Sequence, residues 1–586
     1  MKPKLLLIAA AMAIALLLAF RLHENNNTLS RSFTNLDNNP DSYGEKKIIS
    51  CSPDWDKLKA WIDETDIPLL PGSGNHQWNI YTKNDSAQFY FNQGINTYYG
   101  FHIIEAMASF KKAARFDSSS AVIYWAQALA YGPNINNVGY AASPDALVAV
   151  GKAISLSGKS SAKEKLLIQA QQVRYSSDST QSRVKLNQQY ADKMKEAYQK
   201  FPNDADIAAL YADALMLQHP WDLWKIDGSP KPWTPFIRNV LEKLLVKHPD
   251  HPGANHYYIH VMEPSPFAAK AKPSADRLGK LAPGLSHLVH MPSHIYLRTG
   301  DYRKGALVNE NAVNSYKKYL QLYAPVAADD FLYIIHNLHM QTNHAMMEGD
   351  STYSLQSAKA TINSIPKDYL SIPPPMGNYL QYIYMTPVLV YIRFGNWNEL
   401  LYMQQPDKAQ IYSNVLYHFG KGMAFAHQSK NVEAKQELEM MRQEMKDSSL
   451  AIPMTPFSAP IQGSVVAENL LMGSIALAEK NYTTAINAFS KAATTEENMV
   501  YSEPRDWLLN PKHYLGNAYL QAGKFTAAIQ VFQNDLKNNN ENGWALFGLY
   551  KALQGEKKQA ETQKVFVRFK KAFANADIVL KGPVHL

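Results

Sequence analysis

Cysteine is almost absent from this chain of 586 residues, in which Cys51 is the single example. One thiol excludes an internal disulfide framework and a cysteine-based zinc cluster. Hydrophobic residues make up 46% of the chain and charged residues only 19%, which indicates a folded chain. Any folded part must therefore be stabilised by packing alone.

Clustered basic residues are also missing. The net charge is +8, but the lysines are spread along the chain and no arginine-rich run with interleaved aromatic residues occurs. Such a run is typical of proteins that bind nucleic acid, so we expect no nucleic-acid partner. No segment alternates apolar and polar residues for long enough to predict a sheet.

One long apolar run stands near the start, "LLLIAAAMAIALLLAF" from Leu5 to Phe20, with lysines before it and Arg21 after it. At about 1.5 Å per residue it spans about 24 Å, which is short of a ~30 Å hydrocarbon core and suits a signal peptide. No small-x-small cleavage site follows, which favours an uncleaved membrane anchor. The basic end would then lie inside, and the rest of the chain on the extracytoplasmic, periplasmic side of the inner membrane. Cleavage would instead make the protein secreted.

A repeat with a period of 34 residues occupies most of the remaining chain. Its units place a small residue at position 8 and an aromatic residue at position 24, and three pairs show this: Gly94 with Phe110, Gly473 with Phe489, and Gly516 with Phe532. This is the pattern of the tetratricopeptide repeat (TPR), in which two antiparallel helices touch through small residues. The sequence therefore predicts an all-α, TPR-like helical-hairpin solenoid behind the N-terminal apolar segment.

The predicted organisation has four parts. Residues 1–21 are the signal peptide or anchor, and residues 22–75 are a flexible spacer. Residues 76–400 form an N-terminal and central TPR-like array, and residues 401–586 form a C-terminal TPR array. The segment "QHPWDLWKIDGSPKPWTP", with three tryptophans, interrupts the first array and is expected to be a loop packed across it.

Histidines are concentrated in the middle of the chain, where ten of the 18 lie between His248 and His344. The repeat register places many of them on three successive first helices, at positions 2, 5 and 9, which line the concave groove of a TPR array. Residues three or four apart share one face of a helix. The predicted metal-site residues are His256, His260, Glu263, His287, His290, His294, His336 and His339.

Histidine is the commonest metal ligand, and i,i+4 pairs such as His256/His260 and His290/His294 are ready-made bidentate sites. Together with Glu263 they suit Zn²⁺, Fe²⁺, Mn²⁺ or Cu²⁺. More side chains gather than one ion needs, so either two ions bind or some residues support the ligands. Two alternatives remain open: the groove binds a peptide or an anionic small molecule through hydrogen bonds, or the histidines pack against tyrosines.

Prolines fall at position 7 of two first helices, at Pro292 and Pro387. Pro292 cannot donate a hydrogen bond to the carbonyl of Leu288, so it should kink the helix between His290 and His294. The kink would change the relative aim of the two rings, or it would simply suit a tightly curved solenoid.

Several segments together resemble a family of bacterial TPR proteins, most specifically "HPGANHYYIH" and "HMPSHIYLRTGDY". The resemblance covers about Gly72 to Leu553 and implies a TPR solenoid without choosing between an enzyme and a scaffold. A segment around His76 also resembles a histidine-rich part of the family, which suggests that His76 joins the site, although Gln77 and Trp78 depart from the family pattern.

The leading functional hypothesis is an exported, membrane-anchored TPR protein that binds a ligand in a histidine-rich groove, with a metal ion as the expected occupant and a peptide as the other. One alternative is a metal-dependent enzyme, a hydrolase or an oxygenase, with an open coordination position and Glu263 as a base. Another is an assembly scaffold. A protein or peptide partner is expected, together with membrane attachment through residues 5–20.

Overall fold

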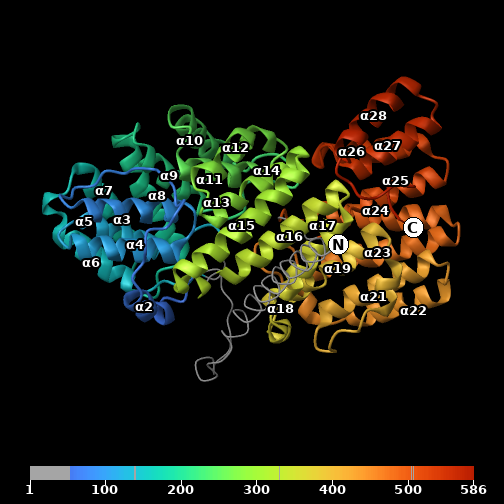
Figure 1. The fold of residues 1–586 in the computed structure, drawn as a ribbon, viewed down its shortest axis with the longest axis horizontal. Helices are drawn as coiled ribbons and strands as arrows, with labels where there is room; N and C mark the ends of the chain where they lie inside the picture. The colour runs from blue at the N-terminus through green and yellow to red at the C-terminus, as the bar shows by residue number, and fades with distance from the viewer. Residues whose placement is uncertain (1–52, 138–139, 329, 503, 506, 586) are drawn as a thin grey trace, which may run out of the picture. The chain divides into compact units, whose positions relative to one another are not determined.

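A computed structural model of the chain describes residues 53–585 apart from residues 138–139, 329, 503 and 506 (Figure 1). The predicted anchor, Cys51 and the first part of the predicted spacer lie outside the described residues. All regular elements in the described part are helices, accompanied by one isolated bridge between Trp224 and Pro230. The all-α prediction is therefore confirmed for this part of the chain.

Helices follow one another along the whole described chain. The N-terminal helices are α2 (Trp55–Glu64), α3 (Asp85–Tyr99), α4 (Ile103–Phe116), α5 (Ala121–Ala130), α6 (Asp145–Leu156), η3 (Ser157–Lys159), α7 (Ala162–Arg174), α8 (Arg183–Lys200), α9 (Ala205–Met216) and α10 (Thr234–Lys247). The central helices are α11 (Pro252–Met262), η4 (Ala268–Ala271), α12 (Lys272–Leu281), α13 (Ser286–His290), α14 (Pro292–Thr299), α15 (Tyr302–Leu322), η5 (Ala324–Ala328), α16 (Asp330–Glu348) and α17 (Ser351–Asn363). The C-terminal helices are η6 (Lys367–Ser371), α18 (Met376–Tyr384), α19 (Thr386–Phe394), α20 (Trp397–Tyr402), α21 (Ile411–His427), α22 (Asn431–Glu444), η7 (Ser448–Ala451), α23 (Pro460–Ala478), α24 (Tyr482–Glu497), α25 (Pro511–Gln521), α26 (Phe525–Asn538), α27 (Gly543–Gly555) and α28 (Gln559–Ala572).

Neighbouring helices pack as hairpins in the register that the repeat predicts. Helix pairs α3/α4, α23/α24 and α25/α26 are in contact, and each pair brings a glycine of its first helix against a phenylalanine of its second. A β-carbon on any of these glycines would lie only 2.3–2.4 Å from the ring, so the helices approach more closely than alanine would allow. The three contacts are Gly94 with Phe110, Gly473 with Phe489, and Gly516 with Phe532.

The structure corrects the C-terminal limit of the predicted spacer. Helix α2 lies within residues 22–75, and its Trp55, Leu58 and Ile62 are buried in the main hydrophobic core. Packing also continues across the boundary predicted between residues 400 and 401, because α21 contacts both α19 and α20. Among the described helices, α23 is long and apolar enough to cross a membrane, and 67% of its most apolar window is buried against other helices, as in a core helix.

Both position-7 prolines coincide with breaks between helices. Helix α13 ends at His290 and α14 begins at Pro292, while α18 ends at Tyr384 and α19 begins one residue before Pro387. Proline has no N–H to donate to the preceding turn, so the ladder of hydrogen bonds is interrupted. The predicted kink is therefore a helix break, and it lies between His290 and His294.

The tryptophan-rich interruption packs across the array as predicted. The Nε1 of Trp221 donates to the carbonyl of Ile135, and the Nε1 of Trp224 donates to the carbonyl of Val261 in α11. Helix α11 also contacts α3 and α14, and α15 contacts α13, α14 and α16. These contacts bring the histidine-bearing helices α11, α13, α14 and α16 together.

Candidate metal centre

Three histidines from α11 and α13 meet at their Nε2 atoms, and we call His256, His260 and His287 trio A. The Nε2 of His256 lies 3.1 Å from the Nε2 of His260 and 3.1 Å from the Nε2 of His287. The i,i+4 spacing on α11 stacks the first two rings, and α13 brings the third from the next repeat. All three side chains are buried.

Three further histidines converge in the same way from α13, α14 and α16, and we call His290, His294 and His336 trio B. The Nε2 of His290 lies 2.7 Å from the Nε2 of His294 and 3.1 Å from the Nε2 of His336. Two ligand nitrogens on one ion, at metal–nitrogen distances of about 2.0–2.1 Å, are about 3.0 Å apart at a right angle and about 3.3 Å apart in a tetrahedron. The spacing in both trios is close to that of ligands around a metal ion.

The other nitrogen of each ring shows where the protons lie in trio A. The Nδ1 of His256 is 2.7 Å from the carbonyl oxygen of Tyr99, which can only accept, so this Nδ1 carries the proton. That carbonyl is available because α3 ends at Tyr99. The Nδ1 of His260 donates to Glu263 over 2.9 Å. In the neutral tautomer, the two facing Nε2 atoms therefore both present lone pairs.

Trio B has the same arrangement. The Nδ1 of His290 lies 2.6 Å from the Oδ1 of Asn309, whose own Nδ2 donates to the Gly305 carbonyl, which identifies Oδ1 as the acceptor facing the ring. The Nδ1 of His294 lies 2.8 Å from the Oε2 of Glu263. Facing lone pairs repel one another and cannot hydrogen-bond, so the geometry favours a cation, a metal ion or a shared proton, between them.

Glu263 connects the two trios. Its Oε1 accepts from His260 of trio A and its Oε2 pairs with His294 of trio B, and the residue is fully buried. Burial raises the pKa of the Glu263 carboxyl, but the His294 and His260 rings outweigh this effect and hold the pKa at about 2. The carboxylate therefore stays charged and fixes the orientation of one ring in each trio.

Burial keeps four of the six rings neutral. It lowers the pKa of His256, His287 and His290 well below the ordinary value, and neighbouring imidazoles lower it further. Burial and the His294 ring lower the pKa of His336 to about 3. Neutral imidazole is the form that binds a metal ion.

Two aromatic residues with strained backbones lie against trio A. Phe101 has φ +56° and Trp221 has φ +59°, a region that bulky residues rarely occupy. The Phe101 ring centroid is 4.5 Å from that of His256 and 5.5 Å from that of His287, and the Trp221 indole meets His260 edge-on at 5.4 Å. Backbone strain of this kind is concentrated at functional sites.

A third polar group, His76 with Asp206 and His251, has a different character. The Nδ1 of His251 accepts from the Ala254 N–H at the start of α11, so the proton of the neutral ring is on Nε2, which is 3.3 Å from Asp206 Oδ1. The same oxygen is 2.8 Å from His76 Nε2 and accepts from the Tyr99 hydroxyl over 2.8 Å. Donors already satisfy this carboxylate, so the group is a hydrogen-bonded network, and His76 joins it rather than either trio.

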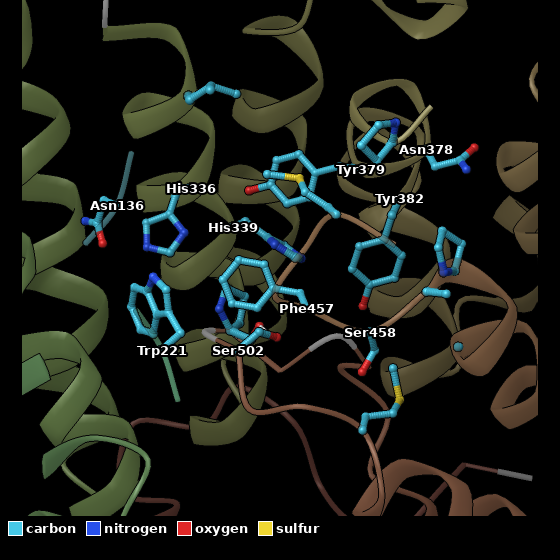
Figure 2. A pocket seen from close by; sticks show the side chains of 18 of the residues that line it. Asn136, Trp221, His336, His339, Asn378, Tyr379, Tyr382, Phe457, Ser458 and Ser502 are labelled. Atoms are coloured by element: carbon cyan, nitrogen blue, oxygen red, sulfur yellow. Dashed lines mark hydrogen bonds between the residues drawn. The ribbon is translucent and has the colours of Figure 1, made fainter. Parts of the chain in front are cut away.

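A cavity of about 220 Å³ opens onto both trios. Figure 2 shows His336 and Trp221 on one side of it, Tyr379 and Tyr382 on the other, and Phe457 between them. Five trio histidines line the cavity, and the rest of the wall comes from α16, α18, α21 and the segments around residues 454–463 and 499–504. Among the described lining residues none is Lys, Arg, Asp or Glu.

The structure brings together seven of the eight residues predicted from the sequence. Six form the trios and Glu263 stands behind them, hydrogen-bonded to Nδ1 atoms. His339 is in neither trio; it lines the cavity, meets Tyr382 edge-on at 5.7 Å and has a buried Nε2 without a hydrogen-bond partner. Whether each residue binds metal stays a prediction. The rings lie in a buried pocket rather than on an open groove.

Sequence reasoning missed the groups that orient the rings. Tyr99 acts through its backbone carbonyl, so its side chain gives no signal. The position of Asn309 in the sequence does not reveal that it contacts His290, because Asn309 lies on the second helix of the hairpin. Phe457 reaches the cavity from the C-terminal array, which a repeat register alone cannot place against the central one.

Comparison with known proteins adds little beyond the fold. No family model and no curated protein matches the chain. One solved structure that matches over most of its length is the human IFIT1 dimer with m7Gppp-AAAA (11% identity, 85% of this chain and 92% of that chain, TM-score 0.29). Another is yeast Tom70 (11% identity, 81% of this chain and 90% of that chain, TM-score 0.28). The P58(IPK) TPR domain also matches (12% identity, 81% of this chain and 99% of that chain, TM-score 0.20).

These TM-scores carry no argument for a ligand or a partner. The predicted bacterial family, the protein or peptide partner and the absence of a nucleic-acid partner stay predictions.

Proposed function

We propose that this protein binds two transition-metal ions, one in trio A and one in trio B, beneath a ligand cavity. The observation that carries the proposal is that Nε2 atoms approach to 2.7–3.1 Å in two pairs of each trio, while the Nδ1 atoms of His256, His260 and His290 face fixed acceptors. Histidines that served only to pack the core would direct their ring N–H donors at hydrogen-bond acceptors. Here lone pairs face one another, which is the arrangement of ligands awaiting a cation.

The donor set narrows the metals. All six converging atoms are imidazole nitrogens, and Glu263 is engaged with the rings behind them. Imidazole suits zinc and copper, whereas manganese favours carboxylate and water oxygens and non-haem iron sites commonly include a carboxylate. Of the four predicted ions, Zn and Cu therefore fit best. Three protein ligands leave a coordination position open in each site.

Elemental analysis of the purified chain after dialysis tests this proposal. We expect about two ions per chain in the wild type, and one fewer in each of the variants His256→Gln and His290→Gln, which keep a polar side chain in the buried position. His427→Ala removes an exposed histidine from α21 and should retain both ions. Circular dichroism confirms that the variants are folded. A folded wild type that takes up no zinc or copper would sink the proposal.

We also propose that the protein acts outside the cytoplasm, attached to the inner membrane through residues 5–20. The apolar run and its basic flank support this location. Mass spectrometry of the mature N-terminus in a membrane fraction tests it. A chain beginning after residue 20 and recovered from the soluble fraction would contradict the anchor.

A further inference from the structure

The cavity is neutral and aromatic where it meets the metal sites. Its described lining contains Trp221, Tyr333, Tyr379 and Phe457, and apart from the histidine rings its polar groups are amides, such as that of Asn378, and hydroxyls. No lysine or arginine is among the described residues that line this cavity, so apart from the proposed ions its wall offers no cationic partner for an anionic substrate such as a phosphate ester. Aromatic walls stack on planar rings, so a neutral aromatic molecule fits best.

The two sites lie side by side. The ring centroids of His287 and His290 are 5.9 Å apart, those of His260 and His294 are 6.4 Å apart, and Glu263 contacts one ring from each trio. An ion in each trio would expose its open position to the same cavity. A ligand with two adjacent oxygen atoms, such as an ortho-diphenol (a catechol), offers one donor atom for each of two such ions.

Charge favours reduced copper over zinc in this pair. Two Zn²⁺ ions would place four positive charges among buried, neutral imidazoles, with the single negative charge of Glu263 beside them. Two Cu(I) ions place only two, and buried charge without a counter-charge is costly. The oxidised pair, two Cu(II), carries the same four charges as two Zn²⁺, but imidazole suits copper, and copper can change oxidation state.

The described lining also lacks a carboxylate or a lysine that could act as a base in hydrolysis. The Oε1 of Glu263 accepts from His260, and its Oε2 lies 2.8 Å from the Nδ1 of His294. The described lining residues include no carboxylate and no lysine. A general base must reach the proton that it removes. The ions themselves must then supply the reactivity, and copper, unlike zinc, can supply it by electron transfer.

We infer that this cavity is the substrate site of a copper-dependent oxidase acting on catechols. The inference rests on the proposed metal sites and assigns their substrate. Each catechol gives two electrons to the copper pair, reducing two Cu(II) to two Cu(I), and releases its two hydroxyl protons as it becomes an ortho-quinone. Dioxygen reoxidises the copper. Two catechols supply the four electrons and four protons that convert one O₂ into two molecules of water.

Oxygen uptake by the full chain loaded with copper tests the inference, with unsubstituted catechol as the probe. We expect saturable uptake, one O₂ for every two catechols, and none from zinc-loaded protein. The His290→Gln variant measures the background from loosely held copper. Copper bound at about two ions per chain without catechol-dependent uptake above that background would overturn the inference and leave the metal sites standing, whereas absence of bound metal would remove both.

A cavity variant separates substrate binding from metal binding. Phe457 is half-buried on a loop, so Phe457→Glu places a charge in the neutral cavity without emptying the core. We expect KM for catechol to rise at least fivefold at unchanged copper content. Val432→Glu adds the same charge at an exposed position on α22 and should leave KM unchanged. Equal KM values in both variants would contradict catechol binding in this cavity.

Discussion

The substitution Glu263→Gln separates the role of the carboxylate from the role of the histidine ligands. Gln keeps the size of Glu but replaces one oxygen with an amide NH₂, which cannot accept. The Nδ1 of His260 and the Nδ1 of His294 both donate to Glu263, over 2.9 and 2.8 Å. One of the two rings must therefore face a donor and lose its anchor.

The size of the effect follows from the hydrogen bond that is lost. A hydrogen bond to a charged group contributes about 1.5–3 kcal/mol, and about 1.4 kcal/mol is a factor of ten in affinity. We expect the site whose ring faces the amide nitrogen to bind metal about 10–100-fold more weakly, as is usual for groups that orient ligands. The other site keeps a neutral acceptor and should lose less than about tenfold.

Competition between the apo-protein and a chromophoric chelator for Zn²⁺ gives both dissociation constants. Asn309→Leu is the matched comparison, because Asn309 supports only His290 and should weaken trio B alone. Glu242→Gln controls for the chemical change, since Glu242 accepts from the Tyr258 hydroxyl on α11. If Glu263→Gln left both constants at the values of the Glu242→Gln protein, the carboxylate would have no part in holding the rings.

Three further outcomes follow from the structure. Gly516→Ala places a β-carbon 2.3 Å from the Phe532 ring and should lower the free energy of unfolding by about 1–3 kcal/mol. Gly151→Ala in α6 meets open space and should raise the free energy of unfolding by up to about 1 kcal/mol. Urea unfolding measures both changes, and the opposite signs would refute the packing. Burial raises the pKa of Asp213 to about 7 despite the nearby Arg174, so the folded protein keeps a proton that the unfolded chain releases above about pH 4. The stability of the wild type relative to the Asp213→Asn variant should therefore fall between about pH 4 and 7. A stability difference between the two proteins that does not change with pH would contradict this. Chelation of the bound ions should lower the unfolding temperature in calorimetry, since each site at 100 times its Kd contributes about 2.7 kcal/mol, and an unchanged temperature would argue against binding to the folded state.

The repeat made much of the fold predictable. Positions 8 and 24 of a repeat lie so close together that only a small residue at position 8 fits against the aromatic ring at position 24. A pair such as Gly473 and Phe489 therefore identifies a repeat without any information about the rest of the chain. Helix breaks at Pro292 and Pro387 were equally visible because proline acts locally. Helix α2 was missed although Trp55, Leu58 and Ile62 recur at helical spacing, because the helix is short and its burial depends on distant helices.

The site was predictable to the level of helix faces but no further. Spacing of three and four residues groups histidines on one helix, yet it cannot tell which ring from the next helix completes a set. His287 joins His256 and His260, whereas His290, three residues later, belongs to trio B. Burial was also beyond the sequence, since the elements that close the cavity come from the C-terminal repeats.

The most direct test of the central claim is a crystal structure of the copper- or zinc-loaded protein with anomalous data collected at the edge of that metal. Two anomalous peaks should appear, each within about 2.0–2.1 Å of the Nε2 atoms of one trio. Trios free of any peak in a crystal grown with excess metal, or a peak only beside His76, Asp206 and His251, would contradict it.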